Sequence, residues 1–212
     1  MHRVPPTTGR RYGSKTAEER RAERRARLMA AALDAFGTDG YGAASIEQLC
    51  AAAGISTRNF YEEFRTREAL LIALHDDVNA RALAAVGAAL AGLNPADLEA
   101  RARAGVRAYF DVMTSDRRWA RIALVESVGI SAEAEAHRRA AIDGFAALLS
   151  GELVRLADAG AITHRDRELT VVALVGAING LVNTWTVTED WDARVDDVVE
   201  TAARLVVLAA RG

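Results

Sequence analysis

The feature that most constrains this chain is a pair of short helical segments within residues 45–67, separated by a single glycine. Ser45 and Gln48 are three residues apart, which predicts a capping box at the start of the first helix. Gly54 follows the last apolar position, where a left-handed helix end favours a residue without a side chain. Ser56 can cap the second helix. The pattern predicts a helix-turn-helix, whose second helix enters the DNA major groove.

A further helix is predicted before this pair. Thr16 and Glu19 form a second capping-box pattern, and an apolar stripe at helical spacing follows it. The stripe consists of Leu28, Met29, Ala32, Leu33 and Phe36, and we expect Gly37 to end the helix. Three helices can also pack in this way for stability alone. The spacing by itself therefore leaves DNA binding and a purely structural role open.

Residues 28–71 resemble the DNA-binding domain of the TetR family of bacterial transcriptional regulators. The matching residues are Ala32, Phe36, Gly40-Tyr41, Ala44-Ser45-Ile46, Ala52-Ala53-Gly54-Ile55-Ser56, Phe60-Tyr61, Phe64 and Thr66-Arg67-Glu68-Ala69-Leu70-Leu71. The resemblance is sharp over the first third, and the length and helical remainder also fit. It implies an all-α fold of about nine helices, with an N-terminal three-helix DNA-binding domain and a C-terminal helical ligand-binding and dimerisation domain.

By this resemblance, Thr57, Arg58 and Asn59 lie at the exposed start of the recognition helix. Arginine can bond guanine, and asparagine adenine, through two hydrogen bonds each. The family often has neutral or basic residues where this chain has Glu62 and Glu63. Carboxylates near phosphate repel it. We therefore expect them either to turn away from the DNA backbone or to read a cytosine amino group.

Four further residues are predicted to contact DNA phosphates. Tyr61 and Arg67 match positions that hold phosphates in the family, although lysine is more usual at the second. Ser45 and Thr66 stand at helix starts, where free N–H groups and the helix dipole favour an anion.

Charge is unevenly distributed along the chain. The net charge is −2, but residues 1–70 carry 12 basic and 9 acidic residues, against 15 and 20 in the remainder. The basic residues before the motif are Arg3, Arg10, Arg11, Lys15, Arg20, Arg21, Arg24, Arg25 and Arg27. Residues 1–15 are predicted to form a basic arm that is disordered without DNA and contacts phosphates or the minor groove. A solvated tail is the alternative.

The expected domains are a DNA-binding domain over 16–71 and a helical body over 72–212. A helix starting at Thr66 is predicted to run to about Leu93, and Asn94-Pro95 to start the next. Later breaks are expected near Thr114-Ser115, Gly129-Ile130-Ser131, Gly160 and Thr188-Glu189-Asp190.

Two segments near the C-terminus are predicted to form the dimer interface. The apolar run from Leu169 to Val182 is too short to span a bilayer and is typical of a buried core helix. We expect the helices near 168–187 and 195–210 to pack against their copies in a second chain, which would set two recognition helices on a palindromic site. The alternative is that both belong only to the monomer's core.

The resemblance also implies a small-molecule ligand in the body, with a mild preference for an apolar or aromatic compound. Candidate contacts are Tyr109, Phe110, Met113, Trp119, Glu126, His137, Phe145, Asn179, Asn183 and Trp185. Each could equally be a core or surface residue.

Catalysis is not expected, because no nucleophile–base set or phosphate loop is legible. No cofactor or metal site is predicted, and the single Cys50 excludes an intrachain disulfide. The polar start lacks a signal peptide pattern, which predicts a cytoplasmic location. The predicted function is a transcriptional regulator, specifically a repressor released from a palindromic operator by a ligand. A helical protein-interaction module without sequence-specific DNA binding is the alternative.

Overall fold

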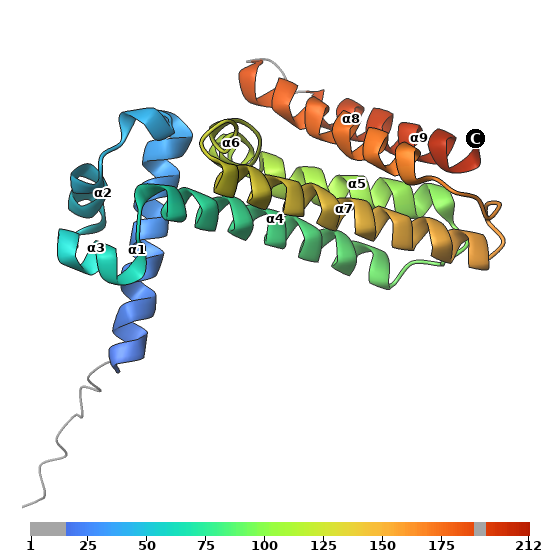
Figure 1. Cartoon of the computed structure of the whole chain (residues 1–212). Helices are drawn as coiled ribbons and strands as arrows, with labels where there is room; N and C mark the ends of the chain where they lie inside the picture. The colour runs from blue at the N-terminus through green and yellow to red at the C-terminus, as the bar shows by residue number, and fades with distance from the viewer. Residues whose placement is uncertain (1–15, 189–193) are drawn as a thin grey trace, which may run out of the picture.

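The computed structural model describes residues 16–188 and 194–212. Within these ranges the protein is all-helical, with nine α-helices and two short turns of other helix types. Figure 1 shows a small head formed by α1, α2 and α3, and an elongated body that extends from it along α4. The expected arm over 1–15 and the break at Glu189-Asp190 lie outside the described residues.

The head begins with the predicted cap. Its elements are α1 (Ala17–Thr38), the 3₁₀ turn η1 (Tyr41–Ala43), α2 (Ile46–Ala53) and α3 (Thr57–Glu63). Thr16 and Glu19 form the expected capping box. The expectation that Gly37 ends α1 is wrong, because the helix continues to Thr38. The chain turns just after the helix, at Gly40, whose φ of 95° favours glycine.

The predicted apolar stripe of α1 forms the centre of the head's core. Leu28, Ala32 and Phe36 are fully buried and pack with apolar residues from α2, α3 and the first turns of α4. One residue of this core comes from much later in the chain. Ile122 is fully buried in the same cluster, so the body completes the core of the head.

The body contains the remaining helices. They are α4 (Arg67–Ala91), α5 (Leu98–Thr114), α6 (Arg117–Arg121), the π-helical turn η2 (Ile122–Glu126), α7 (Ala132–Asp158), α8 (Glu168–Val187) and α9 (Val195–Arg211). Helices α4, α5 and α7 run along the body, and α8 and α9 lie side by side along one edge (Figure 1). Asp97 caps α5, so the expected start at Asn94-Pro95 is wrong. Asn94 instead makes a turn by accepting from the Ala96 N–H.

Helix α8 differs from the expected buried core helix. By length and composition, Glu168–Thr186 could cross a membrane, yet only 28% of that window is buried in the protein. Leu169 and Val172 are 84% and 55% exposed, and Leu205 and Leu208 of α9 are also exposed. The monomer therefore carries an uncovered apolar surface on its last two helices.

Candidate DNA-contact surface and ligand cavity

The helix-turn-helix has the local geometry that its sequence predicts. The Ser45 hydroxyl accepts from the Gln48 N–H, and the Gln48 side chain accepts from the Ser45 N–H. Gly54 adopts the left-handed conformation with φ 63° and ψ 42°. The Ser56 hydroxyl accepts from the Asn59 N–H at 3.2 Å and starts α3. The capping box begins α2, and the left-handed glycine and the Ser56 cap together determine the angle between α2 and α3.

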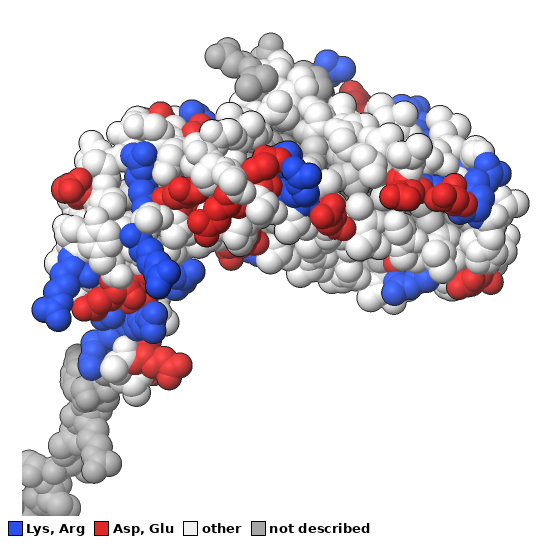
Figure 2. All heavy atoms as spheres, in the orientation of Figure 1, with Lys and Arg blue, Asp and Glu red and all other residues white. Residues whose placement is uncertain are grey.

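One face of α3 packs in the core of the head, while the first turn of the helix is exposed to solvent. Phe60 and Phe64 are buried, with ring centroids 6.2 Å apart. Thr57 and Arg58 are exposed, and Asn59 is half-buried. The predicted base-reading residues therefore lie together at the open end of α3. In Figure 2 several basic side chains lie close together on the head, interspersed with acidic ones, while others are scattered over the body.

Glu63 faces helix α1 and away from the open end of α3. Its side chain is 1% exposed and lies 3.1 Å from both Arg21 Nε and Arg24 Nη2. Of the two expectations for the carboxylates, Glu63 meets the first, because it turns inward. Its charge is neutralised by two arginines of α1, so it joins α3 to α1.

Glu62 has a different environment. Its side chain is 47% exposed, with one oxygen 3.5 Å from Arg58 Nε and the other 3.8 Å from Arg24 Nη2. An exposed pair of this kind contributes little to stability. The pair places a carboxylate beside the guanidinium of Arg58, one of the predicted base-reading residues.

The predicted phosphate contacts fall into two groups. Tyr61 is 55% exposed, and the hydroxyls of Ser45 and Thr66 accept from backbone N–H groups while keeping their own protons available. Arg67 is engaged within the protein. Its Nη1 donates to the Ala44 carbonyl, and its guanidinium lies 4.2 Å over the Tyr41 ring. Arg67 thus ties the start of α4 to the loop before α2.

A polar junction connects head and body. Glu126 accepts from the Tyr41 N–H at 2.7 Å and from Arg121 Nε at 2.8 Å, and Arg121 Nη1 donates to the Thr38 carbonyl. Glu126 is a predicted ligand contact, but it lines neither the apolar cavity nor the polar cavity described below. It holds the turn after α1 against η2.

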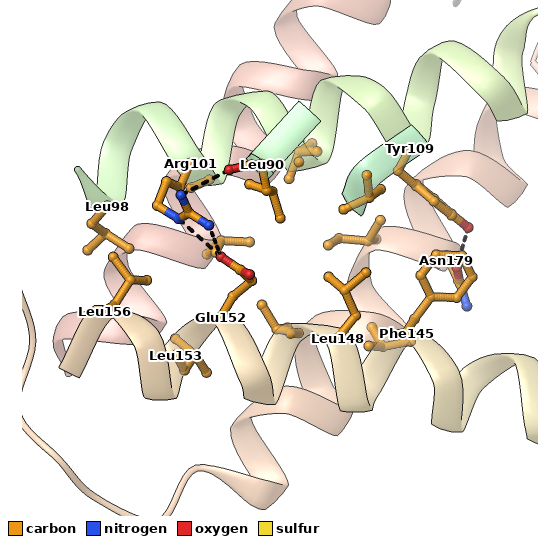
Figure 3. A pocket seen from close by; sticks show the side chains of 18 residues that line it. Leu90, Leu98, Arg101, Tyr109, Phe145, Leu148, Glu152, Leu153, Leu156 and Asn179 are labelled. Carbon is orange, nitrogen blue, oxygen red and sulfur yellow. Dashed lines mark hydrogen bonds and ion pairs between the residues drawn. The ribbon is translucent and has the colours of Figure 1, made fainter. Parts of the chain in front are cut away.

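The body contains an apolar cavity between α4, α5, α7 and α8. The space, including its open mouth, is about 780 Å³. Its walls are almost entirely aliphatic, and Leu98, Leu153 and Leu156 lie towards one end (Figure 3). At that end Arg101 and Glu152, both buried, form an ion pair with Nε–Oε2 at 3.0 Å.

The opposite end carries Tyr109, Phe145 and Asn179 (Figure 3). The Tyr109 hydroxyl donates to Asn179 Oδ1 at 2.6 Å. Burial raises the pKa of the Tyr109 phenol, so the hydroxyl keeps its proton and remains a donor.

A second, polar cavity adjoins this end and shares Phe145 and Asn179 with the apolar cavity. Its polar lining residues also include His75, Asn79, Arg138 and Asn183. His75 is buried, with Nδ1 3.2 Å from Asp76 Oδ1 and Nε2 3.2 Å from Asn79 Nδ2. Burial lowers the pKa of His75, which favours the neutral ring.

Four of the ten predicted ligand contacts line these cavities, namely Tyr109, Phe145, Asn179 and Asn183. The others lie elsewhere. Phe110, Met113 and Trp185 are core residues, Trp119 lies under the Arg81 guanidinium, and His137 pairs with Asp76 at 2.8 Å.

Sequence reasoning missed the buried Arg101–Glu152 pair and His75, Asn79 and Arg138 of the polar cavity. Charged residues on a helix usually face solvent, so their spacing alone gives no signal for burial. The one local clue is that His75 and Asn79 are four residues apart and therefore share a helix face.

Comparisons with known proteins agree with this architecture. Residues 28–74 match the model of the family described as bacterial regulatory proteins, tetR family. A curated relative, the HTH-type transcriptional activator FasR of Mycolicibacterium smegmatis, is 28% identical over 204 residues, which cover 93% of this chain and 88% of FasR.

Several solved structures share the fold. The fatty acid degradation regulator FadR of Bacillus halodurans has a TM-score of 0.75 at 18% identity, covering 94% of this chain and 97% of its own. FadR of Bacillus subtilis in complex with stearoyl-CoA has a TM-score of 0.73 at 18% identity, covering 87% and 97%. A tetR family protein from Rhodococcus RHA1 has a TM-score of 0.67 at 26% identity, covering 88% and 95%.

Proposed function

The chain belongs to the TetR family of bacterial transcriptional regulators, and on that premise we propose that it is a homodimeric repressor released from a palindromic operator by a long-chain acyl ligand. Transcriptional regulation through DNA is the family's role, and the protein is not an enzyme. We further propose residues 16–71 as the DNA-binding domain, preceded by the arm over 1–15, residues 72–212 as the ligand-binding and dimerisation domain, and the cytoplasm as the location.

The observation that carries the proposal is the open end of α3. Two buried phenylalanines anchor α3 in the core of the head. Thr57 and Arg58 are exposed in the first turn of the same helix. In this proposal Thr57, Arg58 and Asn59 face base edges in the major groove. Tyr61 and the hydroxyls of Ser45 and Thr66 bind flanking phosphates.

Only part of the Arg67 guanidinium is available for the phosphate contact that the sequence predicts. Its guanidinium already bonds the Ala44 carbonyl and stacks on Tyr41. We propose that it contacts phosphate only through the N–H groups that remain. Its main effect is then to position Ser45, the residue that follows Ala44.

The proposed dimer uses the uncovered surface of α8 and α9. Small residues Ala173, Gly176, Ala177 and Gly180 are exposed along α8, and a Cβ at either glycine would meet nothing within 4 Å. Such a stripe permits close approach of another helix. A second copy would bury this surface together with Leu169 and Leu208, which also accounts for the membrane-like composition of α8 in a DNA-binding protein.

The proposed ligand class follows from the apolar cavity. Its lining offers few polar partners, which suits an apolar chain, and its walls run between two helical layers (Figure 3). The FadR neighbour in complex with stearoyl-CoA supports an acyl chain. Such a ligand changes DNA binding only if it binds two arrangements of the heads unequally. Helix α4, shared by head and cavity, is the proposed coupler.

The first experiment is selection of random duplex DNA by the purified protein at low and physiological salt. A recovered palindrome would support a sequence-specific dimer, and palmitoyl-CoA should then release the protein from that site. No enriched sequence at either salt concentration would refute the regulator and favour the interaction module.

The sign of regulation is tested separately. We propose repression because a dimer bound across a promoter blocks polymerase without further contacts. The relative FasR is named an activator. Transcription in vitro from the recovered operator should fall when the protein is added. A rise would refute repression while leaving DNA recognition intact.

A further inference from the structure

The polar cavity offers hydrogen-bond donors that the fold itself leaves unused. Arg138 uses Nε and Nη2 to bind both oxygens of Glu135, at 2.8 and 2.7 Å, which leaves Nη1. The side-chain oxygen of Asn179 accepts from Tyr109, while the amide N–H groups of Asn179 have no acceptor among the described residues. Asn183 adds a further exposed amide.

The remaining wall is neutral and fixed. His75 and Asn79 lie buried on one face of α4, and Asn79 Nδ2 also donates to the His75 carbonyl at 2.8 Å. Both oxygens of Asp76 are paired with histidine rings, one with His75 Nδ1 and the other with His137 Nδ1. The carboxylates of Asp76 and Glu135, which pair with His75 and Arg138 of this wall, are thus occupied, and the donors that remain favour an oxygen acceptor.

The far end of the apolar cavity has the opposite character. Arg101 is buried, and besides Glu152 it donates to the carbonyls of Leu90 and Leu93 at 3.1 and 3.0 Å. Leu90 lies in the last turn of α4 and Leu93 just after that helix, so Arg101 ties α5 to the end of α4. A ligand carboxylate could reach this guanidinium only by displacing Glu152 into a buried, uncompensated position, which is costly.

The two cavities share Phe145 and Asn179 in their walls. We propose that they form one binding site with a fixed direction, in which the acyl oxygen atoms of the ligand bind Arg138 and Asn179 in the polar cavity and the methyl end lies against the Arg101–Glu152 pair. The inference rests on the proposed ligand class and adds its orientation and head-group site. A free carboxylate and a thioester carbonyl share this oxygen chemistry.

This direction also places the head group next to the head–body junction. Ala123 and Leu124, which line the polar cavity, belong to η2, the turn that carries Glu126 to the Tyr41 N–H. A group bound to Arg138 and Asn179 therefore contacts the segment that holds the head. The residues that line the apolar cavity include none of η2.

Binding of palmitate and of palmitoyl-CoA to the full-length dimer, measured by calorimetry, tests the orientation. Arg138→Gln removes the cation. Asn179→Asp keeps the acceptor for Tyr109 but replaces the amide donor with a repelling charge. We expect each variant to weaken binding by about tenfold or more. Whichever probe binds the wild-type protein more tightly identifies the source of the head group.

Two further variants separate the possible failures. Arg139→Gln is the matched control, because Arg139 also pairs with Glu135, at 3.6 Å, but lies outside the polar cavity. The Arg139→Gln variant should bind both probes as tightly as the wild type does. Gly105→Leu projects a side chain into the apolar cavity, where a Cβ would sit 3.7 Å from Leu90 and Val86, and should weaken binding in any orientation.

Three outcomes would overturn the orientation. If Gly105→Leu weakens binding but Arg138→Gln and Asn179→Asp do not, the acyl ligand stands and its proposed direction is wrong. If Arg139→Gln weakens binding as much as Arg138→Gln, the loss reflects the net charge of the protein and not a contact between Arg138 and the ligand. If neither probe binds the wild type, the ligand class of the proposed function fails as well, while operator selection remains an independent test of DNA binding.

Discussion

Glu63 illustrates how an acidic residue can belong to the proposed recognition helix while its charge is taken up within the protein. Its carboxylate is buried and lies between Arg21 and Arg24 of α1, on the side of α3 that faces the core. Its neighbour Glu62 stays exposed beside Arg58. Sequence alone left two orientations open for this pair of carboxylates, because which of two adjacent residues faces inward depends on how α3 rotates against α1.

Replacing Glu63 with glutamine should destabilise the head by about 1–3 kcal/mol, because two arginines lose a buried ionic partner. Chemical denaturation of the variant and the wild type would measure this difference. Glu62→Gln is the control and should change stability by less than about 0.5 kcal/mol. Equal effects of the two substitutions would contradict the distinct roles assigned to them.

Arg58→Ala should lower operator affinity and relax base preference by about 1–3 kcal/mol, since its side chain projects from the open end of α3. Tyr61→Phe should weaken binding to all sequences about equally, as expected for a phosphate contact. Binding titrations on a panel of operator variants would separate the two. Unchanged selectivity in Arg58→Ala, or an effect of Tyr61→Phe confined to one base position, would refute these roles.

His75 should make stability depend on pH. Burial lowers its pKa in the folded state, so below about pH 6.5 the unfolded chain binds a proton that the folded protein resists. Stability is therefore expected to fall as pH drops through this range, although Asp76 beside the ring limits the effect and His137 and Arg138 add to it. Denaturation between pH 7 and 5 would show a smaller slope in His75→Asn. An unchanged slope would assign the pH dependence to other groups.

At the scale of elements, the turn between α2 and α3 depends on a single backbone conformation. Gly54→Ala should cost about 1–2 kcal/mol, because alanine is strained at a φ of 63° although its Cβ would find room. Gly87→Ala, within α4 and with open space around its Cβ, should instead stabilise by about 0.5–1 kcal/mol. Thermal unfolding of both variants would test this, and a neutral Gly54→Ala would show that the turn tolerates other conformations.

Element starts that depend on local hydrogen bonds could be predicted from the sequence. Thr16, Ser45, Ser56 and Thr66 all cap helices as expected, because a capping hydroxyl acts on an N–H only three residues away. The start of α5 was misplaced for the same reason. Asn94 and Asp97 are both suitable caps, and the choice between them is made by packing, which sequence spacing does not contain.

At the scale of the whole molecule, the surface of α8 and α9 should decide the oligomeric state. Gly176→Arg places a large charge in the middle of the exposed stripe, where the monomer leaves space and arginine favours the helix more than glycine. Sedimentation should show a monomer at concentrations where the wild type is a dimer, together with weaker operator binding. Gly87→Arg on α4 is the control, and dissociation in both variants would refute α8 as the interface.

The cavities were the least predictable part of the structure. The sequence supplied aromatic candidates, yet Phe110 and Met113 fill the core while Tyr109 reaches the apolar cavity. The ion pair that closes this cavity joins residues 51 positions apart, Arg101 and Glu152. Such a pair arises from the packing of α5 against α7, so no local pattern could have indicated it.

Ile122 of the body has a consequence for protein engineering. It fills the core between α1 and α4 and is followed by Glu126, which holds the turn after α1. A head cut out at residue 71 or 74 would keep every side chain proposed to contact DNA and still expose the space that Ile122 occupies. Chimeras that join the head of this protein to the ligand-binding body of another regulator should therefore keep residues 117–126 together with the head. The transferred unit then consists of two segments that are separate in the gene.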